Sequence, residues 1–284
     1  MNNNFLTETV RFLKKSDIRF YPIEKRPVKL EFEAGKKTGT VVNISLSDTL
    51  MMNSPQISNN FILQIIVVFS TLDAKIDLMY PELQGQTFKF KYENLPQGSD
   101  EEIILRESYR IFKILRNAAT HSMDSITIIN DRIMAQYNFR NTCFELSITQ
   151  TGLSFLFTYI IELFTTNNIY TQNHIKAFNC ELFNLLKNEI SSVKDEFGEG
   201  IFPISNTLRL KRWVRYYIEN PSFEIKKEHL LKITSPYELK SEFEKEYGVD
   251  YLVKLNKNDL YLIPGEVLNN NYELEISGLS YWKL

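Results

Sequence analysis

Side chains capable of chemistry gather in one hexapeptide of this chain, RNAATH at positions 116–121. If the segment is helical, Asn117 and His121 share one face, and the long Arg116 side chain can still swing towards the imidazole. A neutral imidazole can take a proton from a ribose 2′-hydroxyl or give one to a leaving 5′-oxygen. A guanidinium can hold the scissile phosphate and stabilise the charge that builds on its oxygens. The hexapeptide therefore suits RNA cleavage without a metal, with His121 as general acid and base, Arg116 as phosphate ligand and Asn117 as orienting residue.

One copy of the hexapeptide supplies a single histidine, whereas cleavage uses both an acid and a base. A two-fold dimer that brings two copies together would provide both groups. The small residues Ala118 and Ala119 leave room for a second helix to pack closely. We therefore expect a homodimer with a composite active site.

The pattern Arg116-Asn117-x-x-x-His121 resembles the signature of the HEPN superfamily (higher eukaryotes and prokaryotes nucleotide-binding domain). The resemblance extends over residues 55–195 and rests on the motif and its helical setting. It implies an all-α bundle, dimers with facing motifs, and a metal-independent endoribonuclease that needs no cofactor. It also implies a prokaryotic toxin–antitoxin or antiviral defence role, with RNA as substrate and an antitoxin or defence-system protein as partner.

Three other interpretations of the hexapeptide remain open. The arginine can be a surface residue and the histidine can satisfy carbonyl groups of the last helical turn. A HEPN-fold module can keep the motif and only bind RNA, a nucleotide or a protein partner. A structural helical protein can also carry the pattern by accident. The neighbouring Asn117 and the long apolar helix before it favour the nuclease.

Cations and carboxylates on the same two predicted helices are secondary candidates. Three cations precede Arg116 at helical spacing: Arg106, Arg110 and Lys113. Such a stripe can guide an RNA backbone to the site, or it can be a solvated face paired with nearby glutamates. Asp73 and Asp77 lie four residues apart and can orient the imidazole, or they can form a polar helix edge.

The sequence does not predict a metal site. The chain contains two cysteines, Cys143 and Cys180, and lacks CxxC and HxxxH patterns. The aspartate pair has no second pair to complete a set of oxygen ligands. We therefore expect neither a metal nor a cofactor.

A further cluster interleaves basic and aromatic residues between positions 209 and 217. Its cations are Arg209, Lys211, Arg212 and Arg215. Such a cluster can bind single-stranded RNA by charge and stacking. An amphipathic helix that buries Leu210, Trp213 and Tyr217 is the commoner explanation, and we favour it.

Hydrophobic periodicity predicts a mainly α fold, a HEPN-like helical bundle with small peripheral β elements and a C-terminal α+β extension. Helices are expected at residues 5–15, 57–79, 99–121, 153–164, 174–193, 207–219 and 236–247. Extended segments are expected at 18–46, 87–92 and 134–149. We assign residues 1–50 to an N-terminal helix with a β appendage, 51–200 to the bundle with an inserted hairpin, and 201–284 to the extension.

The composition sets limits on the RNA contact. The chain has 284 residues, a formal net charge of -2 and a pI near 6.0. This charge excludes a polybasic protein that coats nucleic acid, but not a nuclease that grips one phosphate. The apolar stretches are shorter than a membrane span, and no signal peptide is visible, so a cytoplasmic protein without membrane contact is expected.

Overall fold

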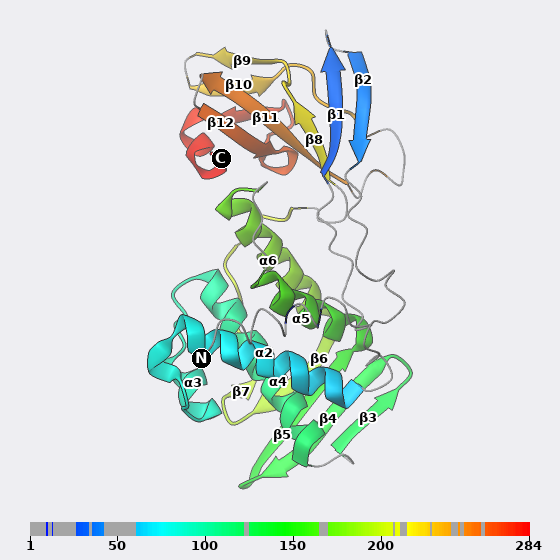
Figure 1. The fold of residues 1–284 in the computed structure, drawn as a ribbon, viewed down its shortest axis with the longest axis vertical. Coiled ribbons are helices and arrows are strands. Elements are labelled where there is room, and N and C mark those ends of the chain that lie inside the picture. Colours follow the sequence, from blue (N-terminus) through cyan, green and yellow to red (C-terminus); the bar gives the residue numbers. More distant parts are fainter. Residues whose placement is uncertain are drawn as a thin grey trace. The chain divides into compact units, whose positions relative to one another are not determined.

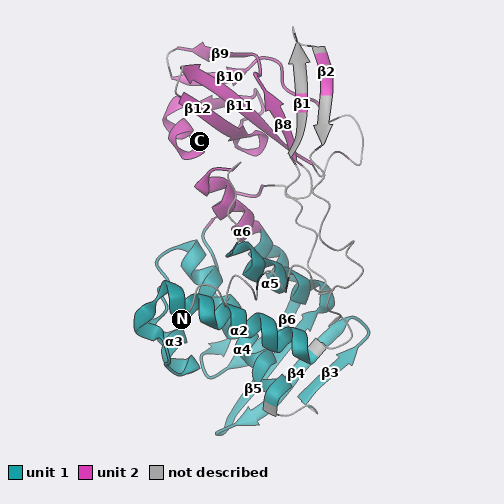
Figure 2. Ribbon diagram, viewed as in Figure 1, with its two compact units in different colours: residues 1–21, 46–165, 182–205 teal, residues 22–45, 166–181, 206–284 magenta. Residues whose placement is uncertain are grey.

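A computed structural model describes most of the chain in two compact units (Figure 2). Unit 1 comprises Met1–Tyr21, Leu46–Thr165 and Leu182–Ser205, and unit 2 comprises Pro22–Ser45, Thr166–Glu181 and Asn206–Leu284. The described residues are 10, 13, 27–33, 36–42, 61–121, 125–164, 170–206, 208–210, 215–227, 229–239, 244, 247–256 and 259–284. The N-terminal β segment and the C-terminal segment, predicted as separate regions, therefore belong to one unit.

Unit 1 combines helices with an antiparallel sheet (Figure 1). Its helices are α2 (Phe61–Met79), the 3₁₀ helix η2 (Pro81–Leu83), α3 (Phe88–Asn94), α4 (Asp100–His121) and α5 (Gln150–Glu162). Helix α6 (Gln172–Asn188) passes from unit 2 into unit 1 after residue 181. The sheet has the order β3-β4-β5-β6-β7. Its strands are β3 (Ile126–Ile129), β4 (Arg132–Phe139), β5 (Thr142–Thr149), β6 (Ile190–Asp195) and β7 (Gly198–Glu199).

Helix α4 carries the hexapeptide and is held in place from several sides. A capping box starts it, because the Ser99 hydroxyl accepts from the Glu102 amide and the Glu102 carboxylate accepts from the Ser99 amide at 2.9 Å. The helix contacts α2 and α3 as well as strands β4 and β5. Its apolar residues are buried almost all round, with Phe112 and Leu115 fully inaccessible. This packing fixes the axis of the helix that ends at His121.

Unit 2 is built on a mixed sheet of order β12-β11-β8-β1-β2 and a small antiparallel sheet of order β13-β10-β9. The strands are β1 (Pro27–Glu33), β2 (Lys36–Val42), β8 (Arg215–Glu219), β9 (Phe223–Lys226), β10 (Leu230–Ile233), β11 (Gly248–Asn256), β12 (Asp259–Pro264) and β13 (Glu273–Glu275). Two 3₁₀ helices, η5 (Gly265–Val267) and η6 (Ile276–Trp282), complete it. Strand β8 pairs in parallel with both β1 and β11, so segments far apart in the sequence share one sheet.

The prediction of a mainly α fold is wrong. Sheets form the framework of unit 2, and in unit 1 a five-stranded sheet packs against α4 and α5 instead of lying at the periphery. The expected strand at 87–92 is helix α3, because the Thr87 side chain accepts from the Phe90 amide and caps a helix. The expected helix 174–193 ends at Asn188, and its last residues belong to β6.

The expected helices of the C-terminal segment also fail where the structure describes them. Residues 215–219 of the predicted helix 207–219 form strand β8. Within the predicted helix 236–247, residues 236–239 are irregular, and most of the remainder lies outside the described residues. The hairpin at 134–149 is confirmed as β4 and β5, and β1 with β2 confirms an antiparallel hairpin within 18–46. Of the expected helix 5–15, only Val10 and Leu13 are described, and both are helical.

Candidate functional site

Arg116 and Asn117 lie side by side in the last turns of α4, and both side chains are partly buried. The Arg116 guanidinium donates from Nη1 to Asn117 Oδ1 at 3.0 Å. Its Cζ lies 5.9 Å from the centre of the Phe69 ring on α2, within the range of a cation–π contact. Among the described residues, Arg116 makes no ion pair with a carboxylate. Its remaining N–H groups are therefore available to an anionic ligand.

Tyr137 on β4 brings a third polar group close to Asn117. Its ring stacks on Phe144 with centroids 4.8 Å apart, which fixes its direction. The hydroxyl oxygen is buried and has no hydrogen bond of good geometry within the described residues, although the Asn117 amide lies close enough to influence it. Burial raises the pKa of Tyr137, whereas Asn117 and Arg116 oppose the rise. The phenol therefore stays protonated and can donate a hydrogen bond.

Tyr137 is not among the site residues that the sequence predicted. The only signal was its place in the alternating run that becomes β4, and alternation alone does not show which helix end the strand faces. The proximity of Tyr137 to Asn117 depends on the packing of β4 against α4. These two elements are not consecutive in the sequence, because β3 lies between them along the chain.

His121 is the last residue of α4, one turn beyond Asn117. Its side chain lies outside the described residues. The structure thus confirms the helical spacing of the hexapeptide, while the position of the imidazole relative to Arg116 stays a prediction.

The cations before Arg116 do not form an exposed stripe. Arg110 is only 4% exposed, and its guanidinium donates to the Asp195 carboxylate at 2.8–3.1 Å. It also donates to the carbonyl oxygens of Gly198 and Gly200 and to Glu107. The Arg110 side chain therefore joins α4 to the β6–β7 hairpin, which favours the structural alternative over an exposed guide for RNA.

Lys113 and Arg106 are also engaged within the protein. Lys113 is buried, forms an ion pair with Glu196 and lies over the rings of three aromatic residues: Phe88, Phe144 and Phe197. Burial lowers its pKa, and Glu196 opposes this effect. Arg106 stacks on the Tyr92 ring and donates to the Gln97 side chain at 2.8 Å. Lys113 therefore presents no free charge to RNA. Arg106 is partly exposed and, among the described residues, contacts only uncharged groups, so its role in guiding RNA stays a prediction.

Asp73 and Asp77 share one face of α2, as the spacing predicted, and both bind Lys91 of α3. The Lys91 ammonium lies 2.8 Å from Asp73 and 2.5 Å from Asp77. Asp73 also accepts from the Tyr109 hydroxyl at 2.5 Å. The pair thus ties α2 to α3 and α4, which favours the structural alternative over orientation of His121.

The basic residue Arg215 is similarly structural. It is 2% exposed and forms bidentate contacts with both Asp250 and Glu266, at 2.7–2.8 Å. The fully buried His174 lies 3.5 Å from the Asp250 carboxylate through Nε2. The prediction that Arg215 belongs to an amphipathic helix is wrong, because the residue lies in strand β8, and its burial disfavours the alternative that it binds single-stranded RNA.

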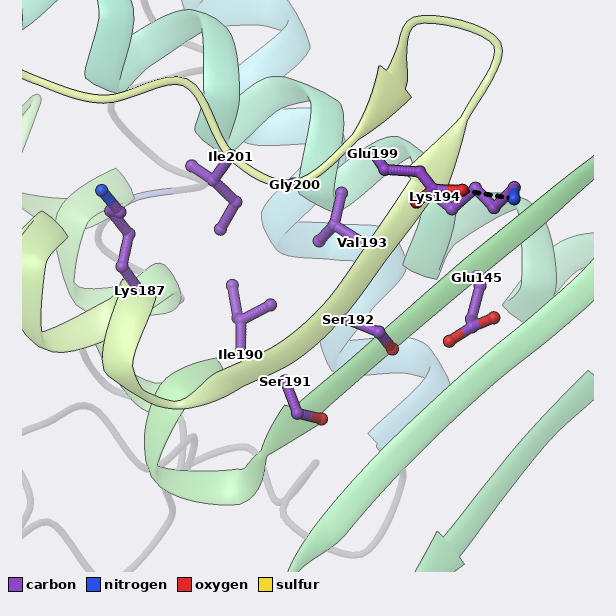
Figure 3. Close-up of a pocket in the computed structure, with 10 residues that line it drawn as sticks. All are labelled: Glu145, Lys187, Ile190, Ser191, Ser192, Val193, Lys194, Glu199, Gly200 and Ile201. Atoms are coloured by element: carbon purple, nitrogen blue, oxygen red, sulfur yellow. Dashed lines mark hydrogen bonds and ion pairs between the residues drawn. The ribbon is translucent and has the colours of Figure 1, made fainter.

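A pocket of about 440 Å³ opens on the sheet of unit 1 (Figure 3). It is lined by Glu145, Lys187, Ile190, Ser191, Ser192, Val193, Lys194, Glu199, Gly200 and Ile201. Figure 3 shows Lys187 and Lys194 at opposite ends, and Lys194 is neutralised by Glu199 at 2.5 Å. None of residues 116–121 lines this pocket, so it is separate from the Arg116 cluster.

Within the described part of the chain, no three His, Cys, Asp or Glu side chains gather as metal ligands, and no helix is long and apolar enough to cross a bilayer. Comparison of the chain with protein-family models, curated proteins and solved structures finds no match. The function must therefore be inferred from the residues themselves.

Proposed function

We propose that this chain is a metal-independent endoribonuclease of the HEPN type, acting in the cytoplasm of a prokaryote in toxin–antitoxin or antiviral defence. His121 moves the protons, Arg116 holds the scissile phosphate, and Asn117 orients the guanidinium. The proposal rests on the motif and its place on α4. It does not include the all-α bundle that the resemblance implied, because the fold is different.

The availability of the Arg116 guanidinium is the observation that supports this proposal most. On the same helix, Arg110 and Lys113 are buried and paired with carboxylates. Arg116 instead contacts an uncharged amide and an aromatic ring. A guanidinium that keeps its charge and several N–H donors is suited to bidentate phosphate binding.

The surroundings of Arg116 add to its suitability for phosphate. The Asn117 contact restricts the rotamers of the guanidinium, so less entropy is lost when an anion binds. The Tyr137 hydroxyl is buried close to Asn117, so it can influence the residue that orients the guanidinium, although it does not reach a ligand itself. Donors that are held in position before the reaction stabilise the developing charge without reorganisation.

The proton transfers require more than one histidine. His121 can be the base that activates the 2′-hydroxyl, and His121 of a second copy can be the acid that protonates the 5′-oxygen. The reaction then gives a 2′,3′-cyclic phosphate and a free 5′-hydroxyl. We accordingly propose a homodimer whose composite site contains two hexapeptides, with an antitoxin or defence protein as regulator.

RNA cleavage by the purified protein in excess EDTA tests this function. We expect His121→Ala and Arg116→Ala to lose cleavage, each by about 100-fold or more. Controls are His229→Ala, whose imidazole is exposed and contacts the Lys227 carbonyl, and Lys89→Ala, whose side chain is 64% exposed. Both controls should cleave as the wild type does.

The nuclease proposal would be overturned if the full-length dimer bound RNA but left it intact at high protein concentration. That outcome would favour the other candidate, a catalytically inactive module that binds RNA, a nucleotide or a protein. Equal losses in the variants and in their controls would show that the hexapeptide has no special role.

A further inference from the structure

We infer that the free edge of strand β3 is a homodimer interface, at which β3 pairs antiparallel with β3 of a second copy and joins two sheets into one. This inference deepens the homodimer of the proposed function by naming its surface. It rests on that function only for the composite active site, since strand pairing itself does not depend on RNA cleavage.

Strand β3 lies at one end of the sheet of unit 1 and pairs only with β4 among the described strands. Figure 1 shows it at the outer edge of this sheet. An edge strand presents unpaired N–H and C=O groups to any strand that approaches it. The sequence of β3, Ile-Thr-Ile-Ile, is rich in the β-branched residues that favour strand pairing.

The absence of charge distinguishes β3 from the other edges. The described edge strands of the three sheets are β2, β3, β7, β9, β12 and β13. All of these except β3 contain at least one charged residue, such as Lys36 in β2, Glu199 in β7 and Glu224 in β9. Charged residues are a common means of preventing edge-to-edge association, and β3 lacks this protection.

The exposed isoleucines of β3 lie on both faces of the sheet. Ile128 pairs with the buried Ile133 and therefore points to the helix-covered face, yet it is 52% exposed. Ile129 pairs with Arg132, points to the opposite face and is 58% exposed. A partner that covered one face would bury only one of them. A strand added at the edge flanks both, which favours extension of the sheet.

The strand is complementary to a second copy of itself. A two-fold axis perpendicular to the sheet requires paired residues to share a face, and this is satisfied when Ile128 lies opposite its own equivalent. Thr127 then lies opposite Ile129, and Ser125 lies opposite Asp131. This register pairs apolar residues at the centre and places no like charges opposite each other. One surface therefore serves both copies.

Light scattering of the full-length chain tests this interface without RNA. We expect a mass of about twice 33.4 kDa for the wild type. Ile128→Lys places like charges directly opposite each other and should weaken dimerisation at least about tenfold. The matched control is Ile225→Lys on the edge strand β9, where the isoleucine is 51% exposed and charged residues are already present. It should leave the dimer intact.

Cross-linking tests the register. In a Cys143→Ser background, Ile128→Cys should form an intermolecular disulfide on mild oxidation, because directly opposite residues lie within disulfide reach. Thr127→Cys should cross-link much less, because position 127 lies opposite position 129 of the second copy and two positions away from the second cysteine. Circular dichroism confirms that the variants fold.

A wild type that is still monomeric at about 100 μM, which corresponds to an association free energy weaker than about −5.5 kcal/mol, would overturn the inference. A dimer that survives Ile128→Lys would overturn it as well. If the dimer forms through β3 but no RNA is cleaved, the interface stands and the nuclease proposal fails. If RNA is cleaved by a dimer that does not involve β3, the nuclease proposal stands and the β3 interface fails.

Discussion

Arg116 donates a hydrogen bond to the side-chain oxygen of Asn117 at 3.0 Å, whereas the buried cations Arg110 and Lys113 of α4 contact carboxylates. The contact orients the guanidinium without neutralising it. The choice between amide and carboxylate at position 117 therefore controls how much positive charge remains for a phosphate.

Asn117→Asp should lower kcat/KM for RNA cleavage by about 100-fold, because a carboxylate of the same size neutralises Arg116 and repels the phosphate. Asn117→Ala loses the orienting contact but keeps the charge, and we expect a loss of about tenfold. Steady-state cleavage of a fluorescent RNA measures both. If Asn117→Asp is the more active of the two variants, the amide does not act through the guanidinium.

Asp195→Ala should reduce the free energy of unfolding by about 3–5 kcal/mol, because it leaves the buried Arg110 guanidinium without its main partner. Urea denaturation of the full-length chain, followed by far-ultraviolet circular dichroism, measures the change. The exposed pair Lys89–Glu93, at 3.8 Å, provides the control, and Glu93→Ala should leave the midpoint nearly unchanged. A small effect of Asp195→Ala would mean that Arg110 finds another partner.

Gly248→Ala should destabilise unit 2 by about 1–3 kcal/mol or more, since a Cβ atom there would lie 2.1 Å from Arg215 Nη1. The guanidinium cannot move away without losing its contacts with Asp250 and Glu266. Gly98→Ala is the control, because the nearest atom to its Cβ lies at an ordinary 3.5 Å. Thermal unfolding of both variants measures the difference, and equal melting temperatures would contradict the close packing at Gly248.

The stability of unit 2 should fall in acid through Asp250. Burial opposes ionisation of this carboxyl, but Arg215 and His174 outweigh burial and hold its pKa below the ordinary value. The unfolded chain binds a proton near pH 3.9, where the folded protein does not, so the stabilisation is present above that pH. It is lost as the pH falls through the lower pKa of the folded state.

Asp250→Asn should remove this contribution. The difference in free energy of unfolding between wild type and variant is expected to be larger at about pH 6 than at about pH 3. Urea denaturation across this range measures it. A difference that does not change with pH would show that the Asp250 charge does not stabilise the fold.

The elements that the sequence predicted correctly are those with strong local signals. Ser99 and Glu102 form the capping box that starts α4, and the alternating runs joined at residues 140–142 form the hairpin of β4 and β5. The hexapeptide also lies on a helix, as its spacing predicted. These features depend on residues that are near each other in the chain.

The errors arise where distant residues decide the structure. Arg215 lies in a strand that pairs with β1 and β11, and its buried charge is compensated by Asp250, 35 residues later, and Glu266, 51 residues later. The buried charge of Arg110 is compensated by the Asp195 carboxylate, 85 residues away. Sequence spacing can show that such cations share a helix face, but it cannot show which carboxylates will reach them. For the same reason, the nearness of Tyr137 to Asn117 could not be predicted.

Analysis of the RNA ends tests the central proposal most directly. The purified full-length protein is incubated with a labelled RNA in EDTA, and the termini are identified by mass spectrometry for the wild type, Arg116→Ala and His121→Ala. We expect 2′,3′-cyclic phosphate and 5′-hydroxyl ends, and we expect their formation to depend on both residues. Cleavage that persists in both variants, or ends that carry a 5′-phosphate, would contradict it.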